Sequence, residues 1–282
     1  NRNEIPSLKN LKRLKVFEYE NWYDSKELEC SNMISEWKCE SLIAFNLSLR
    51  NIEFDSCCLN GMPNLRFIKI EKQSFKMAKI SNLTNLKSLD ISENANLELI
   101  PCAFDGLTNL ESLFLNKSNL KSLQKQLFRH LNNLTVLDLS ENTLNQLDPE
   151  LFASNLKLTH LNLKSTSLTY ITKEHFAQLG HLKSLDLSTN ELKHLPDELF
   201  SSLVSLESLK LNSNKIKEIN ANVFKGLHSL REINLFDNLL DYLPADVFST
   251  LNSLKKVDLD FNFIPESNLK ELRENYPRVE IT

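Results

Sequence analysis

Residues 182–192 read Leu-Lys-Ser-Leu-Asp-Leu-Ser-Thr-Asn-Glu-Leu, which is the pattern L-x-x-L-x-L-x-x-N-x-L. The pattern returns at a step of 24 residues, and its first leucines fall at Leu86, Leu110, Leu134, Leu158, Leu182, Leu206, Leu230 and Leu254. A second column with the same step is aromatic: Phe104, Phe128, Phe152, Phe176, Phe200, Phe224 and Phe248. A third column is polar: Asn94, Ser118, Asn142, Thr166, Asn190, Asn214, Asn238 and Asn262. Three columns in register identify a tandem repeat, and this decides the fold.

The start of each repeat, L-x-x-L-x-L, alternates apolar and polar residues and predicts a short strand with its leucines inward. Strands of successive repeats are expected to stack about 4.8 Å apart into a parallel sheet. The polar column follows the strand, where its side chains can bond backbone groups exposed by the turn. The phenylalanine column is expected to line the opposite wall. No repeat can hide its apolar face alone, so the 282 residues are expected to form one solenoid domain.

On these residues the chain resembles leucine-rich repeat proteins of the 24-residue typical subfamily, from Leu86 to Asn262, with weaker repeats upstream. The resemblance implies an α/β solenoid: a horseshoe with a parallel concave sheet, an irregular convex side and a short C-terminal capping helix. It implies an N-terminal cap or first irregular repeat with an inserted loop over 1–41, repeats over 42–262 and a C-terminal cap over 263–282. The repeats are also similar to those of invertebrate Toll-type ectodomains and of the secreted leucine-rich immune proteins of mosquitoes.

The C-terminal segment predicts a short helix that is capped near Ser267 and stopped by Pro277. Its apolar residues Leu269, Leu272 and Tyr276 are expected to sit on the last repeat. Val279 and Ile281 then predict one closing strand. Most secreted members of the family end in a cysteine-rich cap, whereas no cysteine follows Cys102 here. Either that cap is lost, or the chain is cut before a further segment.

The N-terminal end holds a cluster of four cysteines, which favours a disulfide-stapled cap in an oxidising compartment: Cys30, Cys39, Cys57 and Cys58. The preferred pairing bonds each of the first two to one of the last two. Cys102 lies two repeats further on, about 10 Å by strand spacing, and is expected to be a free core thiol, with an intermolecular bridge as the alternative. Trp22 and Trp37 are expected to pack in the cap, with exposed ligand anchors as the alternative. The chain starts at Asn1 without a signal pattern, which indicates a processed chain or an excised piece.

Four asparagines are candidate glycosylation acceptors: Asn46, Asn82, Asn116 and Asn133. This composition predicts about as many by chance, so they add nothing to the extracellular argument. Asn46 and Asn116 fall at outward strand positions, where sugars would obstruct the N-terminal half of the concave face.

Several kinds of chemistry are not favoured. The 33 basic and 37 acidic residues leave no dominant nucleic-acid footprint, and no apolar run approaches the roughly 18 residues of a membrane span. Four scattered glycines give no phosphate-binding loop, and no hydrolase or zinc-protease motif occurs. The six histidines fall in different repeats or registers, and an aspartate column is expected to occupy solvated strand positions: Asp90, Asp138, Asp186 and Asp258. We therefore expect a non-enzymatic protein without a metal or another cofactor.

The strongest candidate binding surface lies on the outward residues near the C-terminal end. Phe236 and Phe261 are outward aromatics in neighbouring repeats, and with their charged rim they resemble an interface hot spot. The other candidate residues are Arg231, Asn234, Asp237, Asp258 and Asp260. The alternative is that the C-terminal helix covers Phe261, or that Phe236 merely packs beside it.

These features together predict a secreted or extracellular recognition module of innate immunity. Its ligand would be a protein, such as a complement-like factor, or a microbial surface component, bound through the concave face. The alternative is a cell-adhesion, developmental or matrix-organising protein that acts by assembly as a homo- or hetero-oligomer.

Overall fold

The computed structural model describes residues 16–20, 43–48, 53–55, 62–71, 74–77, 83–95 and 97–282. The chain divides into two compact units, and each is described by itself. The first unit contains residues 1–120 and 126–138, and the second contains residues 121–125 and 139–282.

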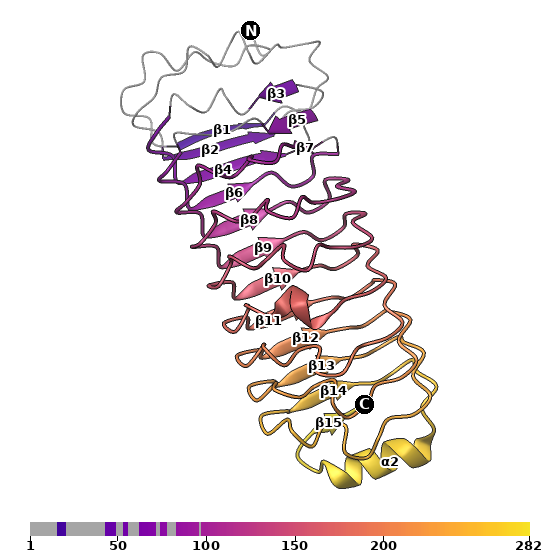
Figure 1. Cartoon of the computed structure of the whole chain (residues 1–282). Coiled ribbons are helices and arrows are strands. Elements are labelled where there is room, and N and C mark those ends of the chain that lie inside the picture. Colours follow the sequence, from indigo (N-terminus) through magenta and orange to yellow (C-terminus); the bar gives the residue numbers. More distant parts are fainter. Residues whose placement is uncertain are drawn as a thin grey trace. The chain divides into compact units, whose positions relative to one another are not determined.

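Parallel strands stack repeat upon repeat in the first unit (Figure 1). They are β1 (Val16–Glu20), β2 (Ala44–Ser48), β4 (Phe67–Glu71), β6 (Ser88–Asp90), β8 (Ser112–Phe114) and β9 (Val136–Asp138). The strand register aligns the inward leucines of successive repeats, since Leu89 pairs with Leu113 and Leu113 with Leu137. The 24-residue step of the sequence is therefore the step of the sheet.

A second, smaller parallel sheet occurs in the first unit, where the sequence predicted only irregular structure. Its strands are β3 (Glu53–Asp55), β5 (Ser74–Met77) and β7 (Glu98–Leu99). They belong to the segments that return the chain to the next strand of the main sheet. β3 and β5 lie in repeats shorter than 24 residues, whereas β7 lies in the 24-residue repeat that starts at Leu86.

The second unit repeats the same plan (Figure 1). Its parallel strands are β10 (His160–Asn162), β11 (Ser184–Asp186), β12 (Ser208–Lys210), β13 (Glu232–Asn234), β14 (Lys256–Asp258) and β15 (Glu280–Ile281). Its helical segments are the 3₁₀ helix η2 (Lys173–Phe176) and the α-helix α2 (Glu266–Asn275). The predicted fold class is confirmed: the chain is a parallel β-solenoid with one short C-terminal helix.

Phenylalanines form the wall opposite the sheet. All seven members of the predicted column are at most 2% exposed. Neighbouring rings stack with centroids about one repeat apart, 6.1 Å for Phe104 and Phe128 and 6.0 Å for Phe176 and Phe200. Burial of each such ring contributes about 1.5–3 kcal/mol, so the column is a large part of what holds successive repeats together.

Asparagine side chains join each turn to the turn before it. The Asn190 amide donates to the carbonyls of Leu163, Leu187 and Ser188, and its Oδ1 accepts from the backbone N–H groups of Thr166 and Leu168. Asn214 and Asn238 make the same kind of bonds one and two repeats later. The predicted role of the polar column, to satisfy groups exposed by the turn, is confirmed.

The residue directly before each member of the polar column has a left-handed backbone. The set is Glu93, Lys117, Glu141, Ser165, Thr189, Ser213, Asp237 and Phe261, with φ between 54° and 59°. Small or polar side chains occupy this conformation at moderate cost, whereas a bulky aromatic there is an outlier. Phe261 is the bulky member of the set.

Helix α2 and strand β15 close the second unit. The helix begins at Glu266 after an extended Pro265, so the predicted cap at Ser267 is wrong by two residues. Proline has φ near −65° and no N–H to leave unpaired, so it can precede the first turn directly. Leu272 is buried, Leu269 and Tyr276 are half-buried, and Ile281 pairs with Val257 in the predicted closing strand. Within the described residues no helix is long and apolar enough to cross a membrane.

Candidate binding surface

The outward side chains of the second unit form a face crossed by ion pairs between repeats. Lys210 lies 3.3 Å from Asp186, and Lys215 pairs with Glu191. Both partners in each pair lie 24 residues apart, which places them side by side on neighbouring turns. Such exposed pairs contribute about 0–1 kcal/mol each to stability, but they neutralise the face locally.

Two phenylalanines interrupt this charged face near its C-terminal end. The rings of Phe236 and Phe261 are in contact, with centroids 4.8 Å apart and planes tilted by 52°. Phe236 is half-buried beneath its partner, whereas Phe261 is 76% exposed, so helix α2 does not cover it. The left-handed backbone of Phe261 costs about 1–2 kcal/mol, a cost that neither burial nor the helix offsets.

Two further exposed apolar side chains lie on the same two repeats, and the sequence did not predict them. Leu239 and Phe263 belong to one column at a step of 24 residues, and Phe263 is 68% exposed. Upstream members of this column are Glu191 and Lys215, so comparing columns would have shown the change from charged to apolar. We call Phe236, Leu239, Phe261 and Phe263 the C-terminal aromatic patch.

Aspartates adjoin the patch on both repeats. Asp237 follows Phe236 and Asp260 precedes Phe261, and the Asp237 N–H donates to the Asp260 carbonyl at 2.9 Å. Both side chains are exposed, and within residues 97–282 neither carboxylate has a lysine, arginine or histidine within ion-pair distance. Lys256, on the strand before Phe261, is held elsewhere. Its pKa is raised chiefly because its ammonium donates a hydrogen bond to Glu280 at 3.0 Å.

Asn234 and Asp258 have a structural part in the same region. Asn234 Oδ1 accepts from the N–H of Phe236 at 3.0 Å, and Asp258 Oδ1 accepts from the N–H of Asp260 at 3.3 Å and from the Thr282 hydroxyl at 3.2 Å. These bonds fix the turn that leaves each strand. Asp90 and Asp186 do the same in earlier repeats, so the aspartate column is more than a set of solvated strand positions.

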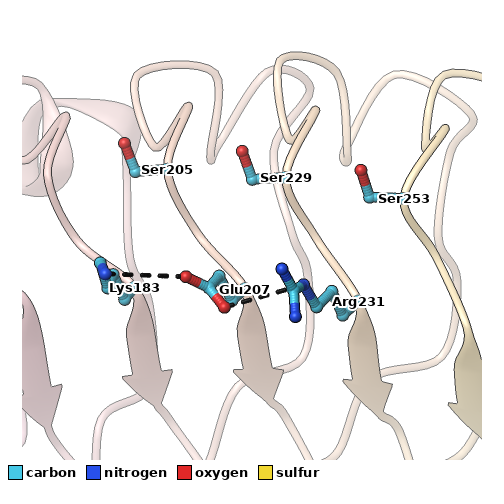
Figure 2. Close-up of a pocket in the computed structure, with 6 residues that line it drawn as sticks. All are labelled: Lys183, Ser205, Glu207, Ser229, Arg231 and Ser253. Carbon is cyan, nitrogen blue, oxygen red and sulfur yellow. Dashed lines mark ion pairs between the residues drawn. The ribbon is translucent and has the colours of Figure 1, made fainter.

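Arg231 is not part of the patch. It precedes β13, whereas Phe236 follows it, and five residues of extended chain span about 16 Å. Arg231 lines a polar groove of about 340 Å³, together with Lys183, Ser205, Glu207, Ser229 and Ser253 (Figure 2). Glu207 lies between the two cations, 3.9 Å from the Lys183 ammonium and 3.7 Å from Arg231 Nε.

The three serines of the groove stand in a row at the repeat step (Figure 2). Ser229 Oγ donates to the carbonyl of Val204 at 2.9 Å, and Ser253 Oγ donates to that of His228 at 2.8 Å. These hydroxyls connect neighbouring loops, and the one carboxylate of the groove lies beside two cations. The groove therefore keeps one excess positive charge, and the Ser229 and Ser253 hydroxyls are used as donors to backbone carbonyls rather than activated as nucleophiles.

The histidine that the structure buries is also structural. The ring of His175 accepts at Nδ1 from the N–H of Thr172 and donates from Nε2 to the carbonyl of Leu147, 3.2 Å away. Within the described part of the chain, no three His, Cys, Asp or Glu side chains gather as metal ligands would.

The remaining sequence candidates are divided between described and undescribed regions. Asn46 and Asn116 are half-buried, and the Asn133 amide donates to the carbonyl of Thr108 at 3.0 Å. Cys102 is a half-buried free thiol. The other candidates lie outside the described residues: Trp22, Cys30, Trp37, Cys39, Cys57, Cys58 and Asn82.

Family models for leucine rich repeats match most of the regular region. A model of the BspA type leucine rich repeat region matches residues 145–270 in six copies, and two further leucine rich repeat models match residues 108–168 and 85–107. The sequence matches no curated protein.

Among solved structures, the chain is similar to one in the crystal structure of a TLR13–ssRNA13 complex. The two are 24% identical, with a TM-score of 0.73, over 91% of this chain and 40% of that chain. This chain therefore spans about two fifths of the length of the TLR13 chain, and at this identity the likeness shows the fold alone.

Proposed function

Because this chain is a leucine-rich repeat protein over residues 85–270, we propose that it is a non-enzymatic module that binds another macromolecule through its exposed sheet face. Stacked repeats hold such a face rigid, so binding orders few side chains and loses little entropy.

The observation that carries the proposal is the C-terminal aromatic patch. Phe261 is exposed on a strained backbone and rests on Phe236. Strain of this kind is typical of functional positions. An exposed aromatic cluster with a polar rim is typical of interface hot spots. We propose that the binding site lies at Phe236 and Phe261, with Asp237, Asp258, Asp260 and Asn234 around them, and that Arg231, at the far end of β13, lies outside it.

The setting we propose is innate-immune recognition outside the cell. The repeat subtype, the clustered N-terminal cysteines and the likeness to TLR13, whose structure was solved with RNA, support it. The proposed ligand is a protein or a microbial surface component. RNA is a poor candidate because the chain has a net charge of −4 and several cations of its sheet face are paired with carboxylates.

A pulldown from extracellular fluid tests this proposal. The wild-type chain should capture a partner that the double variant Phe236→Ala/Phe261→Ala loses. Phe67→Ala is the matched control, since Phe67 is an exposed phenylalanine of β4 in the other unit. Capture that is equal for all three proteins would place the site elsewhere.

The alternative is an adhesion or matrix-organising protein that acts by self-assembly. The same patch favours this reading, because two copies could bury their exposed phenylalanines against each other. Sedimentation velocity should then show a dimer or larger species that Phe236→Ala/Phe261→Ala dissolves. A wild-type chain that stays monomeric at all concentrations would exclude the homophilic form.

A further inference from the structure

We propose that the C-terminal aromatic patch binds a basic segment of a protein partner, one in which arginine or lysine side chains flank an apolar anchor. This inference rests on the proposed function and specifies the chemistry of its ligand.

Upstream on the same face, several charged side chains are paired within the protein. Lys210 pairs with Asp186, Lys215 with Glu191, and Glu207 lies between two cations. A partner that docks on those turns would have to break these ion pairs or present both positive and negative groups to them. Neither requirement selects a partner of one sign.

The charges that adjoin the patch are the carboxylates of Asp237 and Asp260. Asp237 and Asp260 are exposed, and within residues 97–282 no cation lies within ion-pair distance of either carboxylate. Lys256 could have served one of them by its position on β14, but it is bound to Glu280. The patch thus joins uncompensated negative charge to exposed aromatic surface.

These two features select the same kind of ligand. The ring faces of Phe261 and Phe263 attract cations, and a guanidinium can stack on a ring while it bonds a carboxylate. An apolar side chain of the partner would bury against Phe236 and Leu239. Phosphate-bearing ligands would be repelled by the same carboxylates.

Three synthetic peptides with the same leucine and tryptophan positions test the inference, their other positions carrying arginine, serine or glutamate. Fluorescence anisotropy with the full chain should show binding in the order arginine, then serine, then glutamate. The arginine peptide should weaken as sodium chloride is raised. Asp237→Asn/Asp260→Asn should weaken it about three- to tenfold, since exposed charge pairs are individually modest.

Glu98→Gln/Glu218→Gln, which removes two exposed charges elsewhere, should leave binding of the arginine peptide unchanged. Phe261→Ala should weaken it about tenfold or more, as truncation of a hot spot does. Equal binding of the arginine and glutamate peptides would overturn the inference, as would no binding of any peptide or binding that is insensitive to Asp237→Asn/Asp260→Asn.

The charge inference can fail while the proposed function stands. A partner that is lost on Phe236→Ala/Phe261→Ala but unaffected by Asp237→Asn/Asp260→Asn and by salt would show that the patch binds by apolar contact alone. Concentration-dependent dimers that compete with the arginine peptide would identify a second copy of the chain as the occupant, and this too would overturn the inference. If Phe236→Ala/Phe261→Ala weakened binding of neither the partner nor the peptide, both proposals would be wrong.

Discussion

Replacing Asn190 with leucine isolates the contribution of one rung in the asparagine column. Leucine has the same number and branching of side-chain heavy atoms as asparagine, so the change removes hydrogen bonds without leaving a cavity. The three carbonyls that Asn190 serves each keep another donor: the Thr166 hydroxyl for Leu163, the Asn214 amide for Leu187 and the Ser165 N–H for Ser188. Their loss is therefore small.

The two backbone donors that bond to Asn190 Oδ1 differ from these carbonyls in having no second partner within residues 97–282. The N–H groups of Thr166 and Leu168 are buried, and no other acceptor serves them within residues 97–282. A buried donor left without a partner costs about 1–3 kcal/mol, so Asn190→Leu should destabilise this part of the solenoid by about 2–6 kcal/mol. Asn214→Leu orphans one such donor, the N–H of Leu192, and should cost about half as much.

Amide hydrogen exchange is the suitable assay, because repeat proteins open turn by turn and one global unfolding energy can hide a local loss. Protection at Thr166 and Leu168 should fall by a factor that corresponds to 2–6 kcal/mol, about tenfold for each 1.4 kcal/mol. Asn252→Ala, at an exposed loop position, should leave protection unchanged. A loss under about 1 kcal/mol, or an equal loss for Asn190→Leu and Asn214→Leu, would refute the assignment of the energy to orphaned donors.

Three further changes probe other parts of the second unit. Phe200→Ala, in the buried phenylalanine column, should lower the free energy of unfolding by about 3–5 kcal/mol in chemical denaturation, and a loss below about 1 kcal/mol would argue against a packed wall. Gly226→Ala should also destabilise, by about 1–3 kcal/mol for the backbone conformation alone, because φ is +92° and the new Cβ would lie 2.6 Å from the carbonyl oxygen of Ser201. Gly180→Ala is its control, and similar melting temperatures for the two variants would contradict this reasoning. The pKa of Tyr276 is raised, first by desolvation, so the unfolded chain ionises at lower pH than the folded one and stability should fall as pH rises through and above about 10. Tyr276→Phe should flatten that decline in alkaline denaturation, and an unchanged pH profile would show that this phenol does not cause it.

The solenoid could be predicted from sequence because its energetics are periodic. Each leucine or phenylalanine column corresponds to one wall of the core, and the fixed repeat length brings equivalent residues into register. The columns did not predict the pairing between return segments, as in β3, β5 and β7, because these strands lie outside the repeated leucine positions. The start of α2 at Glu266 depended in turn on the backbone of Pro265, which a search for a serine cap does not consider.

The candidate site was predictable in part. Outward positions can be counted along a strand, and this counting brought Phe236 and Phe261 together as the structure has them. The same counting grouped Arg231 with them, because a residue's face does not tell at which end of the strand it lies. Leu239 was not predicted because it follows Asn238 of the polar column and lies beyond the outward strand positions that were counted. That Asp237 and Asp260 have no cation within ion-pair distance depends on side-chain positions, and only coordinates provide these.

The asparagine bonds also make the length of this protein a modular property. Each asparagine fastens its own turn to the preceding one, and the same atoms recur 24 residues later. Excision of residues 190–213 would splice Thr189 to Asn214 and leave Leu-Asp-Leu-Ser-Thr-Asn-Lys-Ile, in which Asn214 meets the partners that Asn190 had. Evolution or an engineer could therefore add or subtract whole turns ahead of the C-terminal aromatic patch without redesigning the seam at which they join.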